Sequence, residues 1–353
     1  MGFLVSILVL SFLVFFHELG HFLAARAFGV RVEVFSIGFG KKLFGFKKGD
    51  TEYVFAAIPL GGYVKMKGQN DFDPSSSNFD SDGYGSKSPI QKIAILLAGP
   101  LSNLLLAGII YFGIAIAGVD TLTSKIGQIS QNSAAMQSGV QSGDRVTSIN
   151  GVEIKYWHEI SENIQKSGSA VMSLGLLRDG KNIDLKLKPI IVETKNIFGE
   201  QSKRYMIGIA PAGVYTKVYY SPIEAISVAV NKTYESAKFI VMGIEKLITG
   251  VLSLDNVGGV ISIVQATNDA THSGLMTLML LTALISVNLG VINLLPIPAL
   301  DGGHIIFNLY ELIFKKAPSE TVFTKLTLAG WAILLWLMLL GLYNDINRLT
   351  GGF

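Results

Sequence analysis

Four long apolar stretches constrain the fold of this chain more than any other feature of its sequence. They cover about residues 2–25, 89–118, 275–295 and 323–343. A helix needs about 20 apolar residues to cross the hydrocarbon core of a bilayer, so each stretch is long enough to span it. The chain is 50% hydrophobic and only 16% charged, whereas soluble proteins average about 25% charged residues. The sequence therefore predicts a polytopic α-helical membrane protein with four transmembrane helices.

The first apolar stretch contains a His-Glu-x-x-His motif, formed by His17, Glu18 and His21. Positions four residues apart share one face of a helix, so both imidazoles can bind the same metal ion while Glu18 reaches a nearby water. Average composition gives such a motif by chance in roughly 1% of chains of this length. Ionisable residues inside a membrane span are costly and are functional candidates by default. The motif therefore predicts a metal centre within the membrane.

A catalytic zinc site needs a further protein ligand beyond two histidines. Asp301 is the best candidate, because two prolines precede it and two glycines follow it at the end of the third apolar stretch. Irregular backbone is tolerated at membrane depth only where it is buried in protein or lines a cavity. Two alternatives stay open at this point. Asp301 could cap a following helix, and His304 could be the ligand instead or support the site from behind.

The distribution of charge predicts the topology. Residues 26–88 are rich in Lys and Arg, and basic loops that flank membrane spans stay in the cytoplasm. The metal site is then expected toward the cytoplasmic side, with both termini outside the cytoplasm. Within this loop, residues 32–39 and 52–66 are predicted strands of a membrane-associated β-hairpin. Residues 70–88, rich in Ser, Asp and Gly, are predicted to form a flexible linker.

After a first membrane half at residues 1–120, residues 121–192 predict a separate α+β domain outside the cytoplasm. Gly143-Asp144 and Ile149-Asn150-Gly151 stand in an order that resembles a PDZ domain of the bacterial protease type. Such domains bind peptide ends or extended segments by strand addition. Residues 193–270 are predicted to be a polar connector and an amphipathic helix. The second membrane half covers residues 271–353.

Composition excludes other kinds of site and partner. The chain has no cysteine, which excludes disulfides and Cys-ligated zinc. A net charge of +3 gives no indication of nucleic-acid binding. Asn103 lies within the second apolar stretch, where it could hydrogen-bond two helices together or act directly in catalysis, and both interpretations stay open.

In their order along the chain, these motifs resemble the bacterial site-2 proteases of the regulator-of-sigma-E protease type. The resemblance is carried by His17-Glu18-x-x-His21, residues 59–66, Ala98-Gly99-Pro100-x-x-Asn103, the PDZ-like block and residues 293–303. It implies one Zn²⁺ ion per chain, bound by His17, His21 and Asp301, with Glu18 as catalytic base. It also implies an edge strand that guides an unwound substrate, and the substrate-binding residues would be Gly61, Gly62, Tyr63, Val64, Asn103, Asn293 and Pro298.

The resemblance implies an intramembrane endopeptidase of the bacterial inner membrane that cuts single-span membrane proteins, such as anti-sigma factors or signal-peptide remnants. A peptide or substrate segment would bind the PDZ groove. Two departures stand out: some relatives have two PDZ domains, and Gly258-Gly259 replaces an expected Gly-Pro pair. A catalytically silent PDZ scaffold with a structural metal site, or a metal transporter, are the alternatives. Glu18 favours the enzyme, because zinc binding alone would not require it, and the chain lacks the internal repeats common in transporters.

Overall fold

The computed structural model describes residues 2–69 and 80–351, which divide into two compact units. The helical unit contains the chain up to Ile114, residues Ile226–Glu245 and the chain from Ser253 onward. The strand-rich unit contains residues Ala115–Ala225 and Lys246–Leu252. The predicted linker at residues 70–88 lies mostly outside the described residues, and its last part contains a short 3-10 helix at Tyr84–Ser86.

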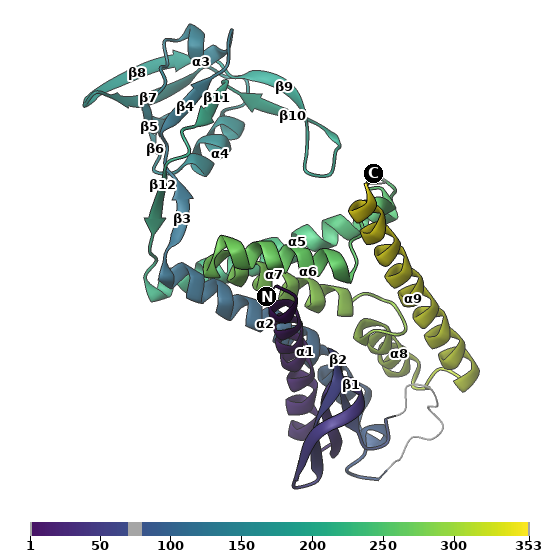
Figure 1. Ribbon diagram of the computed structural model, residues 1–353. Helices are drawn as coiled ribbons and strands as arrows, with labels where there is room; N and C mark the ends of the chain where they lie inside the picture. Colours follow the sequence, from purple (N-terminus) through teal and green to yellow (C-terminus); the bar gives the residue numbers. More distant parts are fainter. Residues whose placement is uncertain (1, 70–79, 352–353) are drawn as a thin grey trace. The chain divides into compact units, whose positions relative to one another are not determined.

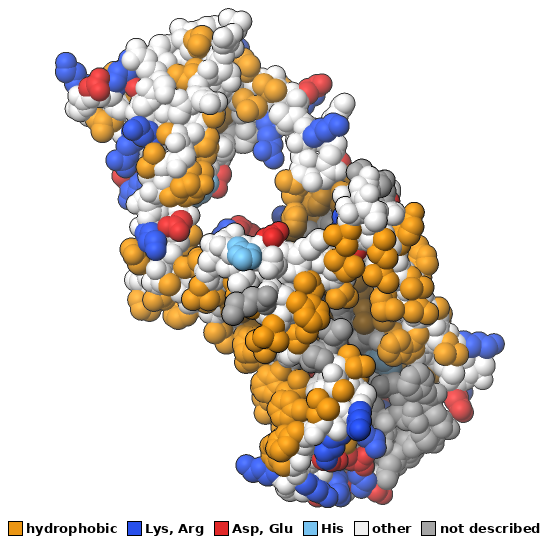
Figure 2. Space-filling model, viewed as in Figure 1, with side chains coloured by type: hydrophobic (Ala, Val, Ile, Leu, Met, Phe, Trp, Pro, Cys, Tyr) orange, Lys and Arg blue, Asp and Glu red, His pale blue; other side chains and the backbone are white. Residues whose placement is uncertain are grey.

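Within the described residues, four helices are long and apolar enough to cross a membrane. They are α1 (Gly2–Ala27), α2 (Pro89–Ala117), α7 (Leu275–Asn293) and α9 (Glu320–Thr350). Each coincides with a predicted span. Large apolar side chains such as Trp331 and Trp336 remain about half exposed on α9, and Figure 2 shows hydrophobic side chains gathered over the surface of the helical unit. Such a surface suits contact with lipid rather than with water.

Three further helices complete the described α-helical framework outside the α3 and α4 helices of the strand-rich unit. They are α5 (Pro222–Ile248), α6 (Val260–Ser273) and α8 (Asp301–Phe314). The amphipathic pattern correctly predicted α5. Helix α6 is too short and too polar to resemble a span, and no local pattern separated it from the predicted connector. It packs against α1 and α7, and the Ser6 hydroxyl lies 3.5 Å from the Val264 carbonyl.

The Gly258-Gly259 pair has a structural role at the start of α6. Asp345 of α9 accepts hydrogen bonds from the backbone N–H groups of Gly259, at 3.0 Å, and Ile261, at 2.9 Å. A proline at position 259 would lack this donor. Glycine also permits close packing, since a Cβ built on Gly341 of α9 would lie 3.0 Å from the Gly259 Cα. The departure from Gly-Pro thus provides a hydrogen bond that ties α6 to α9.

The predicted hairpin is present and longer than expected, with β1 at Val32–Lys48 and β2 at Thr51–Met66 (Figure 1). Two parts of β2 flank the same part of β1: residues 34–37 pair with residues 52–55 on one side and with residues 62–65 on the other. The end of β2 therefore pairs on one side only, with β1. This end has the one-sided pairing expected of the edge strand that the resemblance implied.

A buried apolar cluster fixes the hairpin against α1 and α2. Its members come from α1, from the following turn, from both strands and from α2, and they are Phe22, Ala25, Val30, Val32, Phe35, Met66 and Ile95. Burying a side chain of this size contributes about 1.5–3 kcal/mol. The cluster therefore holds the edge strand in a defined position beside the C-terminal half of α1.

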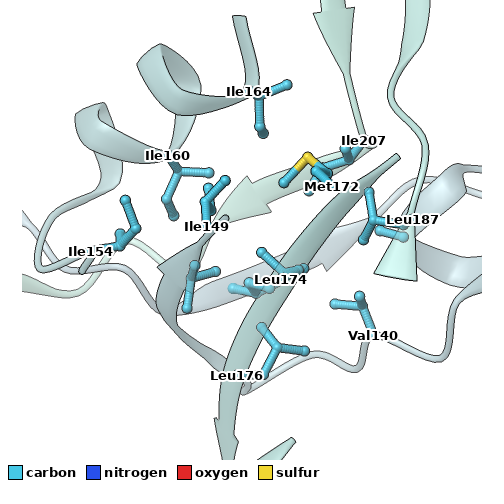
Figure 3. Packing of buried hydrophobic residues seen from close by; sticks show 13 residues of the cluster. Val140, Ile149, Ile154, Ile160, Ile164, Met172, Leu174, Leu176, Leu187 and Ile207 are labelled. Carbon is cyan, nitrogen blue, oxygen red and sulfur yellow. The ribbon is translucent and has the colours of Figure 1, made fainter. Parts of the chain in front are cut away.

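The strand-rich unit is built from short antiparallel strands and two small helices. A four-stranded sheet has the order β6-β5-β7-β8, and three two-stranded pairs are β11-β4, β12-β3 and β10-β9. The bounds are β3 (Val119–Leu122), β4 (Ile126–Ile129), α3 (Ala134–Gln137), β5 (Arg145–Ile149), β6 (Val152–Glu153), α4 (Trp157–Ser167), β7 (Met172–Arg178), β8 (Lys181–Leu187), β9 (Ile190–Lys195), β10 (Gln201–Met206), β11 (Ile209–Pro211) and β12 (Tyr215–Val218). Figure 3 shows the apolar core, where Ile160 of α4 packs toward Met172 and Leu174 of β7.

The predicted domain boundary at residue 192 differs from the structure. The supposed connector contains β10, β11 and β12, and the last two pair with β4 and β3 at the start of the unit. These pairs join residues far apart in the sequence, and such pairing leaves little trace in local composition. The unit consequently extends to Ala225.

An ion pair between the partly exposed Arg178 and the buried Asp144 stabilises the strand-rich unit. Arg178 donates to both carboxylate oxygens of Asp144, at 2.7 and 2.8 Å, and the backbone N–H of Gln141 donates to the same carboxylate at 2.8 Å. Burial alone would raise the pKa of Asp144, but these donors outweigh it and hold the pKa below its ordinary value. The Gly-Asp element of the sequence motif therefore has a structural role.

Candidate metal centre

The two histidines of the motif lie on one buried face of α1. His17 and His21 are 8% and 7% exposed, and their Nε2 atoms are 3.2 Å apart. This is the arrangement that the i, i+4 spacing predicts for a straight helix. These two histidines place polar groups on the buried side of an otherwise apolar helix.

Asp301 completes the cluster from the other end of the chain. Its Oδ2 atom lies 3.2 Å from His17 Nε2 and 3.4 Å from His21 Nε2. Leu300 is the N-cap of α8, so Asp301 is the first residue of that helix and does not cap it. The structure thus favours the ligand interpretation of Asp301 over the capping alternative.

Two glycines allow the segment before α8 to reach this position. A Cβ on Gly302 would lie 2.3 Å from the Leu295 carbonyl oxygen, and one on Gly303 would lie 2.3 Å from that of Ile297. The chain therefore turns back directly onto the first turn of α8, as the Pro-rich and Gly-rich sequence predicted. Side chains at these two positions would push Asp301 away from the histidines.

The donor set fits a zinc ion. Tetrahedral zinc with bonds of about 2.0–2.1 Å requires ligand atoms about 3.3 Å apart, and the three separations observed are 3.2, 3.2 and 3.4 Å. The Asp301 Oδ2 atom is buried and has no hydrogen-bond donor among the described residues. Among the described residues, His17, His21 and Asp301 form the group that could bind a metal ion. A cation would satisfy the orphaned oxygen.

Helix α2 packs against α1 at the metal-ligand candidates and contacts His21. A Cβ on Gly99 would lie 2.3 Å from His21 Nε2, and one on Gly20 would lie 2.2 Å from the Ala98 carbonyl oxygen. The two helices therefore meet with almost no side chain between them, and Gly99 leaves room for the imidazole. His21 Nδ1 donates to the Ile95 carbonyl at 2.9 Å, which leaves the Nε2 lone pair free for a metal.

Glu18 lies next to the edge strand. A Cβ on Gly62 would be 3.2 Å from Glu18 Cγ, and the backbone N–H of Val64 donates a hydrogen bond to the Glu18 carboxylate. Glu18 is only partly buried, unlike the neighbouring histidines. One carboxylate is therefore presented both to the metal cluster and to the open side of β2.

The other predicted site residues lie around this cluster with differing contacts. Asn103 is fully buried, and its Nδ2 atom is 3.1 Å from His17 Nδ1. Asn293 is the last residue of α7. The backbone of Pro298 packs against Gly303 and Gly330. His304 does not join the metal cluster; its ring packs against Phe307 and Phe323.

The predicted edge-strand residues form a small surface of their own. Gly61 accommodates the Phe39 ring, since a Cβ there would be 2.0 Å from it. The same ring stacks on Tyr63 at a centroid distance of 6.3 Å. Sequence reasoning did not identify the roles of Gly99 and of the Ile95 carbonyl. A glycine next to Pro100 was visible, but its contact with His21 depends on how the two helices cross.

A helix of membrane-spanning length that presents His-Glu-x-x-His to a half-buried aspartate is typical of a membrane metallopeptidase. Comparison with known proteins agrees: the chain matches Peptidase family M50 over residues 5–337. The protein belongs to this family and is a zinc-dependent metalloendopeptidase of the membrane.

Several curated relatives cover almost the whole chain. A Campylobacter jejuni protein whose name proposes a zinc metalloprotease is 45% identical over 349 residues, which are 99% of this chain and 94% of the relative. A Helicobacter pylori protein with a similar name is 40% identical, over 98% of this chain and 99% of the relative. The regulator of sigma-W protease RasP of Bacillus subtilis is 29% identical, over 97% of each chain.

Proposed function

We propose that this protein hydrolyses peptide bonds inside the transmembrane segments of single-span membrane proteins. The observation that carries the proposal is the position of Glu18, which stands on a membrane-length helix between the metal cluster and an open strand edge. Sites at this depth meet substrates that lie in the bilayer themselves. Soluble peptides would reach such a site less readily than neighbouring membrane helices would.

The residues of the cluster have distinct roles in this proposal. His17, His21 and Asp301 bind one Zn²⁺ ion per chain. When bound, zinc polarises the scissile carbonyl and acidifies a water molecule. Glu18 accepts the proton of the attacking water and passes it to the leaving amine. Its partial exposure lets it reach both groups, whereas His17 and His21 stay buried.

The end of β2 binds the substrate backbone in an extended form. A peptide bond in a membrane helix is shielded by its own hydrogen bonds, so the helix must unwind before hydrolysis. Unpaired backbone groups of an edge strand can replace the lost hydrogen bonds by strand addition. The N–H of Val64 points toward Glu18, and Gly62 has no side chain to block the approach. Tyr63 and Gly61 would complete this binding edge, with Asn293 and Pro298 on the opposite side of the substrate.

The strand-rich unit acts as a single PDZ domain in this proposal. Its antiparallel sheet, its amphipathic α4 and its Asp144–Arg178 pair support that assignment. It would lie outside the cytoplasm together with both termini, and the metal site would face the cytoplasmic side of a bacterial inner membrane. The name of the Bacillus subtilis relative, a regulator of sigma-W protease, supports membrane-bound anti-sigma factors as substrates. Signal-peptide remnants have the same single-span form.

The test uses the full chain in detergent micelles with a synthetic single-span substrate, and cleavage is followed by mass spectrometry. Glu18→Gln should lose about 10²–10⁴-fold in rate while it retains zinc, and Asp301→Ala should lose both zinc and activity. Glu235→Gln is the matched control, since Glu235 is exposed on α5 with its side chain 64% accessible. Wild-type cleavage should stop on chelation and return with added zinc. Equal cleavage by Glu18→Gln and wild type would refute the mechanism and would point to a different base. No cleavage by zinc-loaded wild type would instead favour the scaffold.

A further inference from the structure

We propose that Asn103 is a positioning residue that orients His17 for metal binding; this inference rests on the proposed metal site. Asn103 is fully buried on α2, within a membrane span. Its amide reaches His17 Nδ1 at 3.1 Å, on the side of the ring away from Asp301. Burial of an amide in an apolar helix costs free energy unless its groups are hydrogen-bonded. The position therefore requires an explanation beyond packing.

The tautomer of His17 provides that explanation. Its Nε2 atom faces His21 and Asp301, so metal binding requires a free lone pair on Nε2 and a proton on Nδ1. That Nδ1–H group needs an acceptor, and the amide oxygen of Asn103 can serve whereas its nitrogen cannot. A half-turn of the amide exchanges the two atoms. When Nδ2 faces the ring, Oδ1 is buried without a hydrogen-bond partner. After the exchange Oδ1 faces the ring and Nδ2 takes the unpartnered position, so the number of unpartnered amide atoms does not change.

Helix α2 then fixes both histidine ligands in the same way. The Ile95 carbonyl accepts from His21 Nδ1, and the Asn103 side chain accepts from His17 Nδ1. Ser286 of α7 holds the α2 backbone in place by donating to the Asn103 carbonyl at 2.8 Å. Removal of such outer partners typically lowers metal affinity 10–100-fold. A residue that merely joins two helices would affect stability without this effect on the metal.

The experiment measures zinc affinity of the full-length protein in detergent by competition with a fluorescent chelator. Asn103→Leu removes the acceptor at similar volume and should bind zinc about 10–100-fold more weakly. Asn103→Asp keeps an acceptor and should remain within a few-fold of wild type. Asn308→Leu is the matched control, because Asn308 is a buried amide that bonds within its own helix, to the His304 carbonyl at 2.8 Å.

Unchanged zinc affinity in Asn103→Leu would overturn the inference. An equal loss in Asn103→Asp and Asn103→Leu would do so as well, because it would mean that the amide donates to His17. If Asn103→Leu does not fold, as judged by size-exclusion chromatography, the Asp variant alone decides between acceptor and donor. A wild-type protein that binds no zinc would count against the proposed function itself. If wild type binds zinc and cleaves the substrate, and Asn103→Leu binds zinc equally well, the result would count only against the role of Asn103.

Discussion

Replacement of Gly99 by alanine tests the geometry of the metal centre with a single added methyl group. The new Cβ would lie 2.3 Å from His21 Nε2 and 2.5 Å from its Cε1 atom. Ordinary contacts of this kind are about 3.5 Å, so the ring must move by about 1 Å or the helices must separate. Zinc sites tolerate deviations of only about 0.2 Å in ligand distance. The His21 ring is also held by the Ile95 carbonyl, so it has little freedom to adapt.

Gly99→Ala should therefore lower zinc affinity and kcat/KM by about 100-fold or more, since a displacement of 1 Å alone can cost about 10²-fold in rate. Chelator competition and cleavage of the synthetic substrate measure the two quantities. Gly113→Ala is the control on the same helix, because the nearest atom to its new Cβ is Met279 Cε at 4.0 Å. Alanine is a better helix former than glycine by about 1 kcal/mol, so propensity would stabilise both variants. If Gly99→Ala binds zinc as tightly as wild type, the close contact between Gly99 and the His21 ring is refuted.

Three further outcomes follow from the structure. Gly303→Ala should weaken zinc binding more than 10-fold in chelator competition, because its Cβ would lie 2.3 Å from the Ile297 oxygen and displace the start of α8; normal affinity would contradict this packing. Leu174→Ala should destabilise the strand-rich unit by about 2–5 kcal/mol, since Leu174 is fully buried, and hydrogen exchange of β7 amides in the whole protein would show it. The lowered pKa of Asp144 means that its ion pair stabilises this unit above the ordinary pKa of 3.8 and that the contribution is lost as pH falls through the lower folded value. Asp144→Asn should therefore remove part of the acid sensitivity that the same exchange measures as the pH falls below the ordinary pKa of 3.8; an unchanged acid profile would contradict the assignment.

Local patterns predicted the helices well, because hydropathy and length determine a membrane span without reference to distant residues. The four spans agree with α1, α2, α7 and α9 to within a few residues at most boundaries. Helix spacing likewise sufficed to place His17 and His21 on one face. The position of Asp301 beside the histidines could be anticipated, because prolines and glycines mark an irregular turn that membranes tolerate only in protected places. Its role as a ligand stays a prediction.

Features that depend on contacts between residues far apart in the sequence were either not predicted or predicted with too short a range. The doubled register of the hairpin and the return of β11 and β12 to β4 and β3 involve residues that carry no local sign of their partners. The role of Gly99 requires knowledge of how α1 and α2 cross. His304 was as plausible a ligand as Asp301 by residue type, yet it lies three residues further along α8, where its ring packs against Phe307 and Phe323.

The separation of the ligands along the chain has a consequence for the life of the newly made protein. His17 and His21 enter the membrane at the beginning of synthesis, whereas Asp301 follows only after the strand-rich unit and α7 have been completed. On the proposed ligand set, a nascent or truncated chain that ends before Asp301 lacks a third ligand and remains inert. The protease would thus be latent until insertion is nearly finished, and incomplete copies would not damage other proteins at the site of translocation.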